Sequence, residues 1–290
     1  MALRAGAIRF NTDSSQMEIY DGNQWTGILA TSPELETGGD TGLIGAVGTD
    51  GSYVNVVDKV NISTTGNAID WADLNYGTAQ NAAYGSRTFG VFAGGYDNPV
   101  RKSNVDYVTI ASGGTATAGG TLTTARNLSG AGASSQTRGL HIGGYVGPAF
   151  PDTYVNTIDY TTISEKSAAV DFGDLAITNK IGTAGGLSSS TRGYILGGAR
   201  YLAPDTTSFN TIQVVTISTT GDATDFGDML AGYQNPTGTA SQTRLVMGTG
   251  EAPSGNYNSL EYITISTLGN AADFGDKANT DSNRNAEWKA

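Results

Sequence analysis

Short segments of alternating apolar and polar residues fill most of the chain, and one pattern recurs five times. The stretch Ile158–Leu175 (IDYTTISEKSAAVDFGDL) has counterparts that start at Val57, Val105, Ile212 and Leu260. In every copy the isoleucine that ends the TI-type segment precedes a fixed Asp or Thr position by eleven residues, as Ile163 precedes Asp174. The length differences between copies therefore lie outside this segment, in loops. Repeats of this length are typical of solenoids and propellers.

Each copy predicts four strands. The third strand is apolar on both faces, because Tyr262 lies on one face while Ile263 and Ile265 lie on the other. A sheet with such strands must be covered on both sides. In one complete copy the predicted strands are Asn127–Ser134, Arg138–Tyr145, Asn156–Ile163 and Val170–Leu175.

Small four-stranded sheets that cover one another describe an all-β protein with a β-propeller fold. We predict a propeller of five blades over residues 41–290. Its first blade lacks a first strand, and residues 282–288 supply that strand and close the ring, which removes exposed strand edges. Two alternatives stay open, an open solenoid and a six-membered ring that includes the N-terminal hairpin.

Residues 1–30 do not follow the repeat and predict a small β-hairpin segment with a turn at Asp21-Gly22-Asn23. A sheet of this size is only marginally stable alone, so it needs a partner surface. Residues 31–40 contain Pro, Gly and acidic residues without periodicity and predict a linker. The predicted partner-binding residues are Ile8, Phe10, Ile19, Tyr20 and Trp25.

The amino-acid composition excludes several classes of function. The net charge is −11, which repels nucleic acid and anionic membranes, and we predict that the protein neither binds nucleic acid nor inserts into membranes. Cysteine is absent, which excludes disulfides and thiol catalysis. The N-terminal residues show no apolar segment of signal-peptide length, so we expect synthesis in the cytoplasm.

The DFGD motif offers two carboxylates per copy, for example Asp171 and Asp174. One hypothesis is a Ca²⁺ site, but two carboxylates are too few for a full cage. The other is a turn whose aromatic residue fills the space between blades while Asp accepts backbone N–H bonds. We favour this structural interpretation and predict no metal site.

Three further residue types recur or stand alone. Arg138, Arg192 and Arg244 occupy one position of the second strand, and an acid such as Asp159 recurs in the third; we predict that they pair. His141 is the single histidine and replaces apolar residues of other copies, which indicates a packed strand position.

A polysaccharide hydrolase needs two carboxylates across a cleft, yet no Asp/Glu pair departs from the repeat. We therefore predict no enzyme, no catalytic residue and no cofactor.

Aromatic residues of the variable loops are the best candidates for ligand binding, since exposed rings stack on sugars or pack on protein. A host surface glycan or receptor is the ligand that such a lectin-type propeller would bind. The candidate residues are Tyr96, Tyr145, Phe150, Tyr154, Tyr201, Phe209 and Tyr257.

Gly-Gly-Tyr strand ends followed by strands like IDYTTI resemble kelch-type repeats, although FGD stands where kelch repeats have Trp. The segment Gly6–Trp25 (GAIRFNTDSSQMEIYDGNQW), followed by repeats like TISTTGNA and DFGDL, resembles virion proteins of tailed phages that infect marine cyanobacteria. This resemblance covers nearly the whole chain. It implies a tail, fibre, baseplate or capsid-associated protein of the virion, present in several copies, whose N-terminal segment binds other virion proteins.

Overall fold

A computed structural model describes residues 4–11, 16–27, 39–45, 48–49, 52–127, 132–147, 153–176, 185–202, 205–234, 236–241, 243–248, 251–252, 255–256 and 258–277. Regular structure in these ranges is β-structure throughout, with no helix among them. In this part of the chain there is accordingly no helix that is long and apolar enough to cross a membrane. The prediction of an all-β protein is confirmed.

The chain divides into two compact units, Met1–Glu36 and Thr37–Ala290, and the division falls within the predicted linker. The first unit is a three-stranded antiparallel sheet of β1 (Ile8–Asn11), β2 (Gln16–Tyr20) and β3 (Trp25–Gly27). Its second turn forms because the Asp21 carboxylate accepts hydrogen bonds from the backbone N–H groups of Asn23 and Gln24, both at 2.8 Å. These bonds hold the pKa of Asp21 below its usual value.

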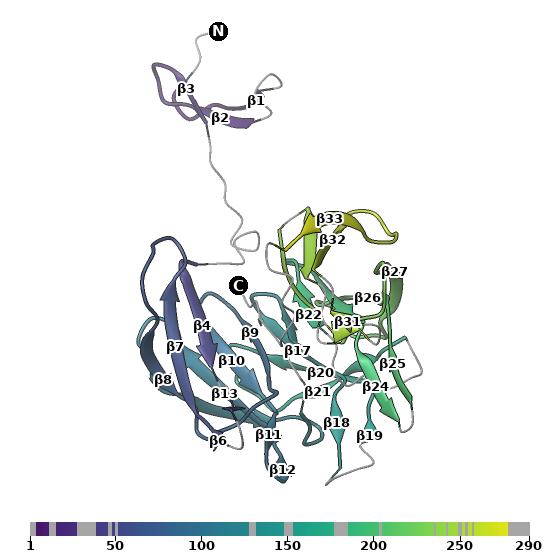
Figure 1. Cartoon of the computed structure of the whole chain (residues 1–290). Coiled ribbons are helices and arrows are strands. Elements are labelled where there is room, and N and C mark those ends of the chain that lie inside the picture. Colours follow the sequence, from purple (N-terminus) through teal and green to yellow (C-terminus); the bar gives the residue numbers. More distant parts are fainter. Residues whose placement is uncertain are drawn as a thin grey trace. The chain divides into compact units, whose positions relative to one another are not determined.

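The second unit contains five four-stranded sheets in chain order (Figure 1). The first sheet consists of β4 (Thr41–Gly45), β7 (Val56–Asn61), β8 (Ile69–Asp73) and, from the next repeat, β14 (Gly114–Thr115). The second consists of β9 (Ala82–Gly85), β10 (Phe89–Ala93), β13 (Asn104–Thr109) and β15 (Thr117–Thr121). The third consists of β16 (Gly132–Ser134), β17 (Arg138–Ile142), β20 (Thr157–Thr162) and β21 (Val170–Asp174). The fourth consists of β22 (Gly185–Ser188), β23 (Arg192–Leu196), β26 (Thr211–Thr216) and β27 (Thr224–Asp228). The fifth consists of β28 (Thr237–Ala240), β29 (Arg244–Gly248), β32 (Ser259–Thr264) and β33 (Ala272–Asp276).

Among the described residues β4 is the edge of the first sheet, and this repeat shows no first strand of its own, as predicted. Residues 282–288, the predicted source of that strand, lie outside the described residues. In the other sheets the first strands β9, β16, β22 and β28 contact one another in chain order.

The variable loops between the second and third strands are two-stranded ribbons rather than irregular loops. Gly143 and Gly144 show why the chain can leave the second strand so sharply: both have positive φ, 57° and 108°, which other residues adopt only with strain. The ribbons are β5 (Gly48–Thr49) with β6 (Ser52–Tyr53), β11 (Tyr96–Asp97) with β12 (Val100–Arg101), β18 (Tyr145–Val146) with β19 (Thr153–Tyr154), β24 (Ala199–Leu202) with β25 (Asp205–Ser208), and β30 (Glu251–Ala252) with β31 (Gly255–Asn256).

The DFGD motif lies in the fourth strand, as predicted for Val170–Leu175, but the turn expected within it is a β-bulge. In the third sheet Ile158 pairs with Gly173 while Asp159 pairs with Asp171, so Phe172 is the extra residue of a β-bulge. The same register shift occurs in the first, fourth and fifth sheets. The expected aromatic plug is confirmed in two sheets, since Phe172 and Phe226 are buried. The bulge turns this ring toward the following sheet.

Four apolar cores lie between successive sheets, one for each neighbouring pair. Phe172 of the third sheet, for example, shares a core with Ile195 and Val215 of the fourth. The second, third and fourth sheets thus bury apolar residues on both faces, as the two-sided pattern of the third strands predicted, whereas the first and fifth sheets each share a core with one neighbour.

We call the contact between two successive sheets a joint. In each joint the connection before the fourth strand of one sheet runs along the fourth strand of the preceding sheet. Between the third and fourth sheets, Gly221 N donates to Phe172 O and Ala223 N donates to Asp174 O, both at 2.8 Å. Ala116 N and Ala169 N make the equivalent bonds in the first two joints, and Ala271 N does so in the fourth. These bonds occupy strand edges that would otherwise be open.

A buried polar side chain of the third strand fastens each joint, and we call it the latch residue. It accepts a hydrogen bond from the backbone N–H two residues beyond the preceding fourth strand. Asn75 N donates to Asp106 (2.7 Å), Thr123 N to Asp159 (3.1 Å), Ala176 N to Gln213 (2.8 Å) and Leu230 N to Glu261 (2.9 Å). All four latch residues are buried.

Candidate functional site

The first unit carries an exposed apolar face. Cross-strand partners in an antiparallel sheet share a face, and Ile8 pairs with Ile19 while Phe10 pairs with Met17. Their exposed fractions are 58% for Ile8, 58% for Phe10, 45% for Met17 and 37% for Ile19. We call these four residues the apolar face. A surface of large apolar side chains on so small a sheet is typical of an interaction site.

The opposite face of this sheet is occupied by its own side chains. Arg9 lies over the Trp25 ring at 4.3 Å, and its Nε donates to Glu18 Oε2 at 2.7 Å. Asn11 donates to the other oxygen of Glu18 at 2.9 Å, and Tyr20 packs against Trp25 with 5.4 Å between ring centres. The bonds from Asn11 and Arg9 lower the pKa of Glu18. The polar and aromatic side chains of this face therefore already have partners within the sheet.

The structure therefore divides the predicted partner-binding set. Ile8, Phe10 and Ile19 lie together on the apolar face, whereas Tyr20 and Trp25 lie on the opposite face. Met17 belongs to the apolar face and was missed by the sequence analysis. Its signal was present, since Met17 and Ile19 alternate with polar neighbours in QMEIY.

The loop aromatics have mixed positions. Tyr145 and Tyr154 are buried against each other at 4.8 Å within their ribbon, so they are not exposed rings. Tyr96 is half-buried, packs edge-on against Tyr53 at 6.1 Å and lies beneath Arg101 at 5.6 Å. Phe209 packs against the core between the third and fourth sheets. Tyr201 lies in β24, although its side chain is outside the description, and Phe150 and Tyr257 lie outside the described residues.

The predicted pairing of strand arginines with repeating acids is wrong. Arg138 donates to the carbonyl oxygens of Ile217 (3.2 Å) and Ser218 (2.8 Å), and Arg192 donates to that of Ile265 (3.1 Å). The acids are instead the latch residues, which face backbone N–H groups. The arginines thus cap the end of the next sheet's third strand.

One buried ion pair, missed by the sequence analysis, strengthens the second joint. Arg126 Nη2 lies 3.0 Å from Asp159 Oδ2, and both side chains are buried. His141, buried beside them, accepts or donates a hydrogen bond with Tyr84 Oη at 3.3 Å. Burial and the Arg126 charge lower the pKa of His141 to about 3, so it is neutral at pH 7. The predicted packed position of His141 is confirmed.

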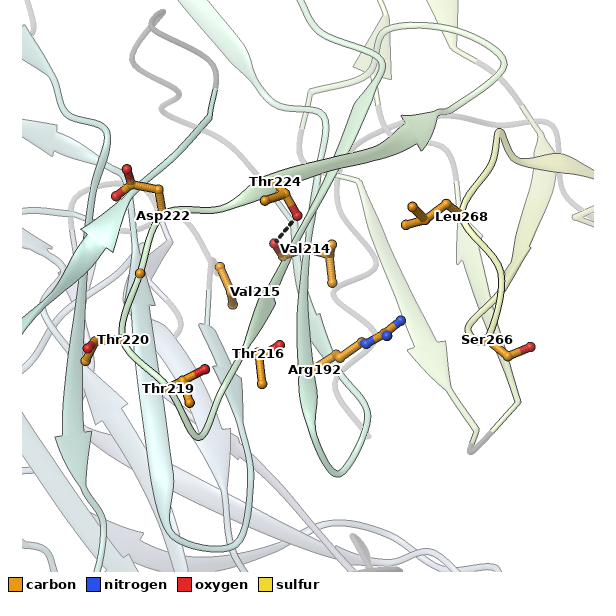
Figure 2. Close-up of a pocket in the computed structure, with 11 residues that line it drawn as sticks. Arg192, Val214, Val215, Thr216, Thr219, Thr220, Asp222, Thr224, Ser266 and Leu268 are labelled. Carbon is orange, nitrogen blue, oxygen red and sulfur yellow. Dashed lines mark hydrogen bonds between the residues drawn. The ribbon is translucent and has the colours of Figure 1, made fainter.

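A pocket of about 340 Å³ lies between the fourth and fifth sheets. Figure 2 shows the residues that line it. Threonine hydroxyls, Arg192 and Leu268 line it, together with Asp222. Asp222 already accepts a hydrogen bond from Asp174 N at 2.9 Å. Within the described ranges, no group of three or more His, Asp or Glu side chains is placed to hold a metal ion.

Comparison with known proteins adds no assignment: no protein-family model matches the sequence, and no curated protein matches it.

Proposed function

We propose that the protein is a non-enzymatic structural component of a tailed-phage virion. The first unit docks on another virion protein through its apolar face, and the second unit is displayed for protein or host-surface interaction. The observation that carries this proposal is the apolar face itself. Four large side chains of a marginal sheet are exposed on one side, while the other side is filled by the Arg9–Trp25 stack.

The fold of the second unit is proposed to be a five-bladed propeller closed by the C-terminal residues. Five sheets of one design, linked by joints of one design, support this proposal. The contacts between successive first strands also support it, because these strands lie nearest the axis of a propeller.

Particle incorporation tests the docking function. The double variant Ile8→Ser/Phe10→Ser is introduced into the phage that encodes the chain, and the protein content of purified particles is measured by quantitative mass spectrometry. We expect incorporation to fall at least about tenfold, since two buried apolar side chains contribute roughly 3 kcal/mol or more to an interface.

A matched control separates the two faces of the sheet. Arg9 lies between the two substituted residues in the sequence but points to the opposite face. Arg9→Gln removes a solvent-exposed ion pair, which contributes little to stability, and leaves the apolar face intact. Normal incorporation of the Ile8/Phe10 variant, or an equal loss with Arg9→Gln, would contradict docking by the apolar face.

Host-glycan binding by the ribbons is a second candidate. The half-buried Tyr96, with Tyr53 at its edge and Arg101 above it, is the described ribbon site closest to a sugar-stacking platform. Purified protein is applied to an array of host surface glycans beside a Tyr96→Ala variant. Binding that the variant loses supports the proposal, and an array without any bound glycan argues against it.

A further inference from the structure

Four joints connect the five sheets, and among the described residues no joint covers the outer face at either end of the series. The first sheet has no preceding sheet on which its turn Thr64–Ala68 can lie. No turn of the described ranges lies along β33 of the fifth sheet. We call these the first-sheet face and the fifth-sheet face.

The fifth-sheet face has the shape of an unoccupied joint. Phe274 is 50% exposed, whereas its counterparts Phe172 and Phe226 are 2% and 3% exposed. A Cβ atom on Gly227 would lie 2.4 Å from the backbone oxygen of Gly269 in the next turn. A Cβ atom on Gly275, at the same motif position, would meet nothing within 4 Å.

The first-sheet face carries the residues that correspond to the other side of a joint. Ile44 pairs directly with Asp58, as Ile195 pairs with the latch residue Gln213. Ile195 is fully buried, whereas Ile44 is 50% exposed. Ile62 is likewise exposed, whereas its counterpart Ile217 is buried.

The polar elements of a joint are also present on the first-sheet face. The turn Gly66-Asn67-Ala68 repeats Gly269-Asn270-Ala271 of the fourth joint. In that joint Asn270 Oδ1 accepts from Asp228 N at 3.0 Å. Asp58 stands at the latch position but is only half-buried, and its carboxylate bonds to no backbone N–H group of a preceding fourth strand within the described ranges.

We propose that the first-sheet face and the fifth-sheet face of one chain bind each other as a fifth joint. Gly66 N then donates to Phe274 O, Ala68 N donates to Asp276 O, and Asn67 Oδ1 accepts from Asp276 N. The inference rests on the propeller fold proposed above and names the residues that close it. A joint is a head-to-tail contact, and repeated head-to-tail contacts form a ring when the rotation closes. The two faces belong to one chain, so the effective concentration of one face at the other is in the millimolar range. This favours contact within the chain over contact with a second copy.

Engineered cysteines test the contact, since the chain has no cysteine of its own. The pair Asn67→Cys/Asp276→Cys joins the two faces. The pair Asp222→Cys/Asp174→Cys is the matched positive control, because these are the equivalent positions of the third joint, where the Asp174 backbone N–H donates to Asp222 Oδ1 at 2.9 Å. After mild oxidation, non-reducing electrophoresis and peptide mass spectrometry measure the cross-link. We expect a monomer with an internal 67–276 disulfide in a yield similar to that of the control.

Two outcomes would overturn the proposal. Absence of the 67–276 cross-link beside an efficient control means that the two faces do not meet. A cross-linked dimer means that a second copy occupies the fifth-sheet face. Neither result bears on particle incorporation by the apolar face, so failure of this inference is distinguishable from failure of the docking function.

A pair of glycine variants provides a second measurement. Gly227→Ala and Gly275→Ala impose similar backbone strain, because φ is 153° and 137°. In a closed ring both added methyl groups collide with a turn, so the two variants lower the melting temperature by amounts within about 2 °C of each other. A clearly smaller loss for Gly275→Ala contradicts closure.

Discussion

At the scale of single residues, the latch positions show that one geometry tolerates different chemistry. Gln213 fastens its joint with a neutral amide, whereas Glu261 and Asp159 use carboxylates. The latch carboxylates differ in their other partners. Glu261 also accepts from Tyr233 Oη at 2.9 Å, whereas Asp159 neutralises the buried Arg126. The charge is therefore needed at Asp159 and not at Glu261.

We predict opposite sensitivities for the two amide variants. Glu261→Gln keeps an acceptor for Leu230 N and lowers the free energy of unfolding by less than about 1.5 kcal/mol. Asp159→Asn leaves Arg126 buried without a counter-charge and costs roughly 3–5 kcal/mol. Urea denaturation of the two variants and the parent measures both values. Equal losses would show that the charge of Asp159 is not what the joint requires.

His141 makes part of the stability depend on pH. Its pKa is 6.5 in an unfolded chain and about 3 in the folded protein, where Arg126 and burial oppose its charge. Between these values the unfolded chain binds a proton that the folded chain does not, so lowering the pH favours unfolding. The full contribution is present above pH 6.5 and is lost as the pH falls towards 3.

The variant His141→Ile tests this dependence, because Ile195 fills the same position of the fourth sheet. Between pH 6.5 and 4.5 we expect the parent to lose up to about 2.7 kcal/mol more than the variant, at 1.36 kcal/mol per unit. Urea midpoints at both pH values measure the difference, and the shared carboxylates cancel in the comparison. Parallel losses in parent and variant would rule out His141 as the cause.

At the scale of elements, the sequence predicts strands better than it predicts what they touch. The constant spacing from Ile163 to Asp174 and the two-sided third strands are local patterns, and both the four strands and their burial are confirmed. The strand around Phe172 is predicted, but its bulge is mistaken for a turn, because Asp and Gly favour turns and bulges alike. Arg126 and the latch bonds were missed since their partners lie in another repeat, and no sequence period indicates such contacts.

The turn before the fourth strand is held by a side-chain cap that recurs in successive joints. Asp222 Oδ1 and Asn270 Oδ1 cap the same backbone N–H position in successive joints, at 2.9 and 3.0 Å. Asp222→Asn should therefore be nearly neutral, whereas Asp222→Ala loses the bond and costs about 0.5–1.5 kcal/mol. Thermal unfolding of both variants measures this difference. A large loss with Asn would assign the effect to charge rather than to the bond.

At the scale of the whole molecule, the two units have separate interiors. The sheet of β1–β3 is held by its own ladder and by the stack on Trp25, whereas every described residue of the second unit's four cores is Leu43 or a later residue. The stability of the second unit should accordingly not depend on the first.

Deletion of residues 1–36 provides the corresponding test. We expect the truncated chain to unfold in one main transition within about 2 °C of the same transition in the full chain, since no buried core residue is removed. Differential scanning calorimetry measures the transition, and the full-length Ile8→Ser/Phe10→Ser variant is the control for loss of the apolar face alone. A large drop in the transition temperature for the deletion but not for the double variant would show that the first unit supports the fold of the second. The apolar face would then need another explanation than a partner outside the chain.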